Sequence, residues 1–304
     1  MSLFSKDPLR SEAVIYPPPK RESKIVVHVP SSIINVEKGV LKKTFIVGLL
    51  GRACGIFRVD VIDIYVDPDS SLEEALFIKK ILEYMTTPSY LRKYLISLDK
   101  NLRGVGVLPP LATPNQPSQE IISGRHFREA LVVDLRKDTV YLEAGLGELV
   151  SVHLDKERLS SIKKGDRVVI EVENNNIASI IPREEFMKRF YWVFQVSISK
   201  SLRESLRKFR GSVIISSRKG EYIDDKVAKK LVELYDRGDL SVVFGSPSRD
   251  PDEIADIEGW DIDKVVNLVI NTAPLQGVRS IRTYEALYIT LSLINNTIYI
   301  SKKL

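Results

Sequence analysis

Apolar and polar positions repeat with two different periods along this chain. Runs of β-branched residues predict strands, and apolar residues spaced three and four positions apart predict helices. Up to about residue 100, and again after residue 187, predicted strands and helices alternate, which favours an α/β fold with a parallel sheet covered by helices. The predicted strands are 24–30, 56–66, 191–198, 213–216, 240–244 and 265–270, and the predicted helices are 36–53, 71–85, 88–98, 201–208, 225–236 and a last one starting near 286.

The middle of the chain has a different pattern of short strands joined by turns. Five such strands are predicted, at 129–135, 140–144, 148–153, 167–172 and 177–181, with turns at 137–138, 164–166 and 174–176. Five strands over so short a stretch are typical of a small β-barrel of the OB type, which often binds single-stranded nucleic acid. The alternative interpretation is a rigid spacer without a ligand.

Changes of composition mark the predicted domain boundaries. The first 22 residues are polar and proline-rich, which is typical of a flexible arm, and four prolines in 108–117 indicate a crossing between domains. We therefore expect a discontinuous α/β domain formed by residues 23–115 and 187–304. The OB-like barrel would be an insertion of residues 116–186.

Composition narrows the class of protein. The net charge of +5 and a pI of about 9.0 are compatible with a polyanionic partner, although proteins that never bind nucleic acid share such values. The single cysteine, Cys54, excludes an internal disulfide and fits a reducing, cytoplasmic location. No apolar run reaches the roughly 20 residues that span a bilayer, so we expect no membrane association.

Familiar metal and nucleotide motifs are missing from the sequence. The three histidines, His28, His126 and His153, are scattered without cysteines or paired carboxylates at ligand spacing, so we expect no metal site. Neither the phosphate-binding loop of nucleotide hydrolases nor the glycine-rich loop of dinucleotide-binding proteins occurs. An unrelated nucleotide hydrolase is therefore disfavoured.

Residues 271–287 carry the strongest chemical signal. This polar loop follows an apolar strand, contains Pro274 and Gly277, and precedes a helix, so free backbone N–H groups meet at one place. Gln276, Arg279, Ser280, Arg282 and Thr283 are crowded into it, which favours a polar or anionic ligand. A second loop, 245–250, also follows a strand, and ligands of open α/β sheets lie beyond the carboxyl ends of strands. Either loop alone would be read as an ordinary turn.

Two further basic segments have competing interpretations. Arg52 and Arg58 lie in the segment 51–60, where a guanidinium could bind phosphate, although a solvated helix end is the simpler reading. The run 200–219 is rich in Lys and Arg, including Lys200, Arg203 and Arg207. It is compatible with an RNA backbone or with a solvated helix face.

At these residues the chain resembles a known family, the archaeal and eukaryotic branch of the SPOUT RNA methyltransferases that carries an OB-like insertion. One departure is Thr113-Pro114-Asn115-Gln116, where the family pattern has a Pro-His-His-like segment. The matching pieces follow the family's order over nearly the whole chain after Lys24; they are Gly51-Arg52-Ala53, Ile56-Phe57-Arg58-Val59-Asp60, Pro88-Ser89-Tyr90-Leu91-Arg92, Leu108-Pro109-Pro110-Leu111, Tyr191-Trp192, Phe244-Gly245-Ser246-Pro247 and 271–295.

The resemblance implies S-adenosylmethionine bound in a C-terminal trefoil knot, and a homodimer whose active site is completed by the partner subunit. Arg52 would act near the methyl group and the RNA, and Arg282 and Glu285 are further catalytic candidates. Arg58, Lys200, Arg203, Arg207 and Arg279 are the expected RNA-binding residues. Carried onto this sequence, the cofactor-binding residues would be Gly245, Ser246, Pro247, Ile270, Asn271, Gln276, Gly277, Val278, Ile281 and Thr283.

Two hypotheses of different classes follow. The first is an S-adenosylmethionine-dependent methyltransferase that modifies a base or ribose atom of ribosomal or transfer RNA. The alternative is a non-catalytic RNA-binding or ribosome-assembly protein that uses the OB-like domain as its reader. The two differ in whether the chain binds the cofactor.

Overall fold

The structure is a computed structural model that describes residues 16–117, 125–173 and 176–303. Contacts between residues divide the chain into two compact units. The larger unit comprises residues 22–86, 97–111 and 194–304, and the smaller one comprises 87–96, 112–193 and the N-terminal segment up to residue 21. The domain boundaries expected near residues 115 and 187 stay a prediction.

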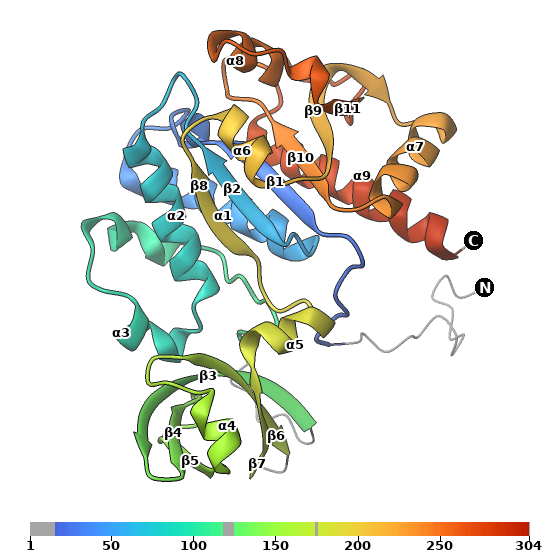
Figure 1. Ribbon diagram of the computed structural model, residues 1–304. Coiled ribbons are helices and arrows are strands. Elements are labelled where there is room, and N and C mark those ends of the chain that lie inside the picture. The colour runs from blue at the N-terminus through green and yellow to red at the C-terminus, as the bar shows by residue number, and fades with distance from the viewer. Residues whose placement is uncertain (1–15, 118–124, 174–175, 304) are drawn as a thin grey trace, which may run out of the picture. The chain divides into compact units, whose positions relative to one another are not determined.

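The larger unit contains a six-stranded sheet in which every neighbouring pair is parallel, as the alternating pattern predicts (Figure 1). Its strand order is β11-β9-β10-β1-β2-β8. Because parallel strands point the same way, their carboxyl ends share one edge of the sheet. The strands are β1 (Ile25–Pro30), β2 (Val61–Tyr65), β8 (Gln195–Ser199), β9 (Ser212–Tyr222), β10 (Leu240–Phe244) and β11 (Val266–Asn271).

Helices cover both faces of this sheet (Figure 1). Apolar side chains of α6 and α8 join strand residues in one core cluster, while α1 packs against α2 and α9, and α7 packs against α9. The helices of this unit are α1 (Val40–Ile56), α2 (Leu72–Thr86), α6 (Leu202–Lys208), α7 (Asp225–Asp236), α8 (Pro251–Ile257) and α9 (Thr283–Lys303), and its 3-10 turns are Ser31–Ile34, Lys100–Val107 and Ile262–Lys264.

Local sequence explains where several helices begin. Asp224 accepts a hydrogen bond from the Val227 N–H and caps α7, whose buried side chains recur on one face. Asp250 and Glu253 form a reciprocal capping box at the start of α8, with Pro251 at its first position. α7 and β10 have the predicted bounds, whereas α8 was not predicted.

Several predicted elements have other bounds in the structure, and four differences bear on the fold. The strand expected from 56 begins only at Val61, because α1 continues through Ile56 and ends with Arg58 at a positive φ of 52°. Instead of a helix over 88–98, the chain forms a 3-10 turn at Ser89–Leu91 and one helical turn, α3 (Arg92–Leu95). The strand expected from 191 begins at Gln195. β9 continues six residues beyond the predicted Ser216.

The smaller unit contains a curled antiparallel sheet of the five predicted strands, in the order β5-β4-β3-β6-β7. Ala130, Val140, Leu142 and Ile170 belong to its core cluster. Residues 174–175 of one predicted turn lie outside the described residues. The strands are β3 (Arg125–Arg136), β4 (Thr139–Glu143), β5 (Val150–His153), β6 (Arg167–Glu173) and β7 (Asn176–Pro182), and the short helices α4 (Lys156–Ser160) and α5 (Arg183–Arg189) accompany them. An OB-type barrel stays a prediction.

A buried polar cluster lies beneath α6 in the larger unit. His28 Nδ1 is 2.6 Å from the Ser205 hydroxyl, which donates a 2.5 Å hydrogen bond to Asp63, and Ser197 donates to the other Asp63 oxygen. His28 and Asp63 are completely buried. Burial lowers the pKa of His28 to about 4, while the pKa of Asp63 lies below its usual value because these hydrogen bonds outweigh its desolvation.

Acidification should therefore destabilise the larger unit. Between pH 6.5 and about pH 4 the unfolded chain binds a proton at His28 that the folded chain does not bind. Stability should fall with decreasing pH by up to about 1.4 kcal/mol per pH unit from this group. Urea unfolding at several pH values measures the slope, and His28→Phe should flatten it; an unchanged slope in the variant would contradict this role of His28.

Among the described residues, no helix combines the length and apolar character needed to cross a bilayer.

Candidate functional site

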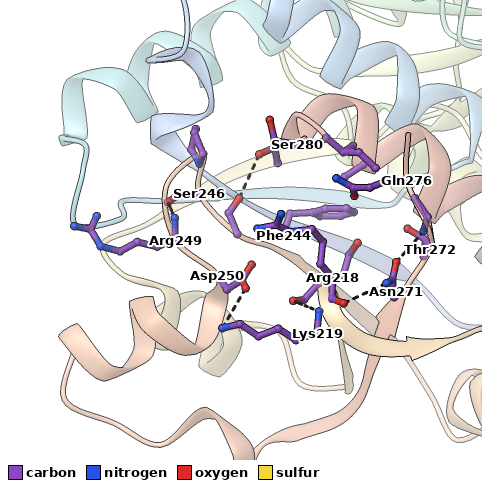
Figure 2. A pocket seen from close by; sticks show the side chains of 18 of the residues that line it. Arg218, Lys219, Phe244, Ser246, Arg249, Asp250, Asn271, Thr272, Gln276 and Ser280 are labelled. Carbon is purple, nitrogen blue, oxygen red and sulfur yellow. Dashed lines mark hydrogen bonds and ion pairs between the residues drawn. The ribbon is translucent and has the colours of Figure 1, made fainter. Parts of the chain in front are cut away.

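A cavity of about 330 Å³ lies beyond the carboxyl ends of β9, β10 and β11 (Figure 2). Three segments form most of its lining: the second half of β9, the loop after β10, and the loop between β11 and α9. The two strand-end loops singled out in the sequence thus meet at one cavity. Its lining residues are Ser216, Ser217, Arg218, Lys219, Phe244, Gly245, Ser246, Pro247, Ser248, Arg249, Asp250, Glu253, Asn271, Thr272, Ala273, Gln276, Ser280, Ile281, Thr283, Ala286 and Ile289.

The loop after β10 turns tightly beside the cavity. Phe244 is buried, and its carbonyl oxygen accepts a 2.6 Å hydrogen bond from the Tyr65 hydroxyl. The Ser246 hydroxyl accepts the Arg249 N–H at 2.9 Å. A Cβ atom at Gly245 would lie 2.6 Å from the Arg249 carbonyl oxygen, which is closer than real Cβ contacts allow. Only glycine fits this turn.

Gly245 and Gly277 should therefore respond differently to alanine. Gly245→Ala forces the loop to shift and should destabilise the protein by about 1–3 kcal/mol, with weaker ligand binding. A Cβ atom at Gly277 meets no protein atom within 4 Å, so Gly277→Ala should leave the stability of the unliganded protein within about 0.5 kcal/mol of wild type. Thermal unfolding of both variants checks this, and equal destabilisation would contradict the described loop geometry.

The loop after β11 is tied to both neighbouring segments. Asn271 Oδ1 accepts the Ala273 N–H at 3.1 Å, and Asn271 Nδ2 donates to the Arg218 carbonyl at 3.2 Å. The Thr283 hydroxyl donates to the Gly245 carbonyl at 3.3 Å, which links this loop to the end of β10. Within the loop, Gln276 Nε2 donates to the Val278 carbonyl at 2.8 Å. The loop is therefore held in place by short-range and long-range hydrogen bonds.

The third wall is a bulge in β9 that the sequence did not predict. Ile215 pairs with Val269 of β11, and the next pair joins Glu221 to Ile270, so residues 216–220 are extra in β9. Bulges often change the direction of side chains beside functional sites. Polar Ser-Ser-Arg-Lys-Gly breaks the alternation of a strand, which is the only signal that the sequence holds for this wall.

Most predicted cofactor-binding residues line the cavity. They are Gly245, Ser246, Pro247, Asn271, Gln276, Ile281 and Thr283. Ile270 does not line it, because its side chain is buried within the sheet, and Gly277 and the exposed Val278 also lie outside the lining. The assignment of all ten to a cofactor stays a prediction.

Arg52 does not line the cavity of its own chain. It projects from α1, and its Nη1 donates to the carbonyls of Pro110 and Leu111 at 3.0 and 2.8 Å. Tyr288 of α9 is close enough for the charge of Arg52 to act on its pKa, which burial raises and the arginine lowers. The guanidinium is thus positioned by the Leu108-Pro109-Pro110-Leu111 segment.

Arg282 and Glu285 also lie outside the cavity lining. Arg282 Nη1 forms a 2.9 Å ion pair with Glu37, which lowers the pKa of that carboxyl group. Arg282 and Glu37 line a second, largely apolar groove of about 410 Å³. Its other lining residues are Leu41, Lys42, Phe45, Ile46, Leu49, Val107 and Tyr284. Glu285 accepts the Arg282 N–H at 2.8 Å and caps the start of α9. The contacts of both side chains are structural within one chain, and their catalytic assignment stays a prediction.

The predicted RNA-binding residues fall on two separate segments. Lys200, Arg203 and Arg207 are exposed at and along α6, whereas Arg279 is exposed in the loop after β11. Arg58 is half-buried just after the end of α1. Two other cations of the basic run 200–219 are paired, since Lys208 contacts Asp63, and Lys219 contacts Asp250 and Asp252.

Within the described ranges, no three His, Cys, Asp or Glu side chains are arranged to bind a metal ion. Cys54 is completely buried, which raises the pKa of its thiol. The cavity itself is lined by main-chain groups, hydroxyls, amides and charged side chains.

Ligands of open α/β proteins bind beyond the carboxyl ends of the strands, which is where this polar cavity lies. Residues 24–294 match the sequence profile of the family described as "Putative RNA methyltransferase", and the chain belongs to that family.

Named relatives agree with this membership. An uncharacterized protein of Haloarcula marismortui is 29% identical over 89% of this chain and 98% of its own length. The 28S rRNA (uridine-N(3))-methyltransferase of Drosophila melanogaster is 26% identical over 89% of this chain, which spans 61% of that protein. The human protein of the same name is 27% identical, over 88% of this chain and 76% of its own length.

Proposed function

We propose that this protein transfers a methyl group from S-adenosylmethionine to RNA, with the cofactor bound in the cavity beyond β9, β10 and β11. The observation that carries the proposal is the meeting of the 245–250 loop with the 271–283 loop at one cavity, in a member of an RNA methyltransferase family. These loops hold most of the residues that the SPOUT resemblance assigns to the cofactor.

The cavity fits such a ligand in size and chemistry. Its volume of about 330 Å³ lies at the lower end of the roughly 300–1,000 Å³ typical of small-molecule sites. Gly245 has no side chain that would keep a ligand from the main chain, and Ile281 and Ile289 offer apolar surface. Asn271 and Thr283 add amide and hydroxyl groups to the lining. This combination suits an adenosine ring system and its sugar.

The proposed reaction needs alignment and the removal of a proton. The cofactor supplies an activated methyl group on its sulfonium, and the cavity walls orient it. The names of two relatives specify uridine N3 of 28S rRNA, and we extend this substrate class to the present chain. N3 of uridine carries a proton at neutral pH, so a nearby cation would favour its loss by stabilising the anionic base. Arg52 is proposed for that role.

We also propose that the protein acts as a homodimer, since Arg52 does not line the cavity of its own chain. Apolar side chains remain exposed on α1 and α9: Leu41 is 58% exposed, Phe45 47%, and Tyr299 and Ile300 50% each. Leu41 and Phe45 also line the 410 Å³ groove. A second copy that covers this surface would let Arg52 of the partner subunit serve the cavity. Ultracentrifugation of the wild type and Phe45→Glu tests this arrangement.

Three finer features belong to the proposal through the family resemblance. The C-terminal segment is proposed to be threaded as a trefoil knot. The curled five-stranded sheet is proposed to be an OB-like RNA reader. The single, buried cysteine is in keeping with a cytoplasmic location.

Cofactor binding and RNA modification are tested separately. S-adenosylmethionine at 100 times its Kd should stabilise the protein by about 2.7 kcal/mol, whereas ATP at the same concentration should not. Ribosomal RNA from cells lacking the gene, incubated with protein and cofactor, should gain 3-methyluridine detectable by mass spectrometry. No stabilisation, together with tight and salt-sensitive RNA binding, would favour the non-catalytic RNA-binding alternative.

A further inference from the structure

One of the cationic side chains that line the cavity has no partner in the part of the chain that the structure describes. Three cations line it: Arg218, Lys219 and Arg249. Lys219 Nζ lies 3.2 Å from Asp250 and 2.9 Å from Asp252, and Arg249 forms an ion pair with Asp69. Among the described residues, the Arg218 guanidinium has neither an ion pair nor a hydrogen bond. In Figure 2 its side chain lies between Phe244 and Lys219.

The main chain that carries Arg218 is nevertheless firmly held. Residues 216–220 form the bulge in β9, and the Arg218 carbonyl accepts the hydrogen bond from Asn271 Nδ2 at 3.2 Å. The Lys219 N–H donates to the Ser217 hydroxyl at 3.1 Å. A Cβ atom at Gly220 would lie 2.6 Å from main-chain atoms of Ile270, so the bulge closes against β11 only with glycine there. A fixed main chain with an unpaired guanidinium is the arrangement expected of a pre-organised anion site.

A negatively charged side chain lines the same cavity as Arg218. Glu253, at the start of α8, lines the same cavity, is exposed and takes part in no ion pair among the described residues. Its Oε2 accepts the Asp250 N–H at 2.8 Å, which leaves its other oxygen available. A cation and an anion in the lining of one cavity complement a zwitterion. An RNA phosphate would instead be repelled by Glu253, which no cation pairs with among the described residues.

From this geometry we infer that the end of the cavity formed by the β9 bulge and the start of α8 binds an α-amino acid group, with Arg218 on its carboxylate and Glu253 on its ammonium. The inference rests on the proposed function, since the methionine end of S-adenosylmethionine is such a group. It assigns the nucleoside to the opposite side of the cavity, near Ile281 and Thr283.

Calorimetry with two ligands tests the assignment. S-adenosylhomocysteine carries the amino acid group, and 5′-methylthioadenosine lacks it. Arg218→Gln should weaken S-adenosylhomocysteine by about ten- to a hundredfold, as expected for a lost charge-assisted contact, and change 5′-methylthioadenosine by less than about twofold. Glu253→Gln should also weaken the binding of S-adenosylhomocysteine and leave the binding of 5′-methylthioadenosine unchanged. Arg237→Gln removes the same charge from the exposed end of α7, outside the cavity, and should change neither affinity.

The other outcomes separate the possible errors. Equal weakening of both ligands in Arg218→Gln would overturn the assignment, because the arginine would then support the cavity as a whole. Unchanged binding of both, with weaker RNA binding and a salt dependence reduced by about one phosphate contact, would overturn it in favour of a phosphate. Wild-type protein that binds neither ligand would contradict the proposed function itself.

Discussion

Replacing Arg52 by alanine should lower the rate of RNA methylation by about 10²–10³-fold while the Kd for S-adenosylhomocysteine stays within about twofold of wild type. One end of this guanidinium is fixed by the carbonyls of Pro110 and Leu111, so its remaining N–H groups and its charge can face a substrate. The loss should fall on the chemical step, because Arg52 lies outside the cofactor cavity. Single-turnover methylation measures the step, and Arg237→Ala is the charge control.

Lysine at position 52 separates charge from geometry. Arg52→Lys keeps the positive charge but cannot hold two carbonyls and a substrate with one planar group. We expect it to recover only part of the lost rate. A parallel loss of cofactor affinity in Arg52→Ala would contradict the role, since it would place the arginine in the cofactor site or in the support of its walls.

Mixing two inactive variants would reveal whether Arg52 acts in the partner's site. Ala273→Phe should fill the cavity and abolish cofactor binding while leaving Arg52 intact. If sites are shared between subunits, a mixed dimer with Arg52→Ala regains one complete site, and equal mixing should restore about a quarter of wild-type activity. No recovery, in a sample shown to contain mixed dimers, would mean that Arg52 serves the cavity of its own chain or none.

Replacing Glu129 by alanine should destabilise the smaller unit by about 3 kcal/mol. Glu129 is completely buried, and its Oε1 lies 2.8 Å from Arg183 Nε and 2.7 Å from Arg167 Nε. Asn115 Nδ2 donates to the other oxygen at 3.1 Å. The variant leaves two largely buried guanidinium groups without their counter-charge, and Glu129→Gln should cost less because it keeps a hydrogen-bond acceptor.

Tryptophan fluorescence can follow each unit separately. The chain has two tryptophans, Trp192 in the smaller unit and Trp260 in the larger. In a Trp260→Phe background, urea unfolding monitored at Trp192 should shift for Glu129→Ala, whereas the exposed Glu148→Ala should remain within about 0.5 kcal/mol of wild type. An unshifted Trp192 transition in Glu129→Ala would show that the buried cluster does not stabilise this unit.

Glu129→Ala also tests the proposal that the curled five-stranded sheet of the smaller unit binds RNA. RNA affinity should fall if this sheet binds RNA, while S-adenosylhomocysteine affinity should not change.

The local sequence pattern was sufficient to predict the bounds of elements whose sequence is compatible with only one kind of secondary structure. α7 combines an aspartate cap with a regular apolar face, and β10 is a short apolar run before a turn, so both have their predicted bounds. Ile56 illustrates the limit, since an apolar residue at this point suits the end of α1 or the start of β2. Arg58 adopts the αL conformation just after the helix, a position where glycine is the usual residue, so the sequence does not indicate that the helix ends there.

The site was predictable only where it depends on topology. Parallel strands bring their carboxyl ends together, and on that ground the loops after β10 and β11 could be expected to meet. The third wall could not be predicted, because residues 216–220 bulge out between Ile215 and Glu221, which pair with β11, a strand distant in sequence. In the sequence Arg218 is only one cation of the basic run 200–219. The structure distinguishes it, because it lies in the bulge and lines the cavity.

A crystal structure of the protein with S-adenosylhomocysteine tests the central claim most directly. The account predicts the nucleoside between the 245–250 and 271–283 loops, beside Gly245 and Ile281, with the amino acid group toward Arg218. A ligand bound elsewhere, or no binding at millimolar concentration with these loops unchanged, would contradict it.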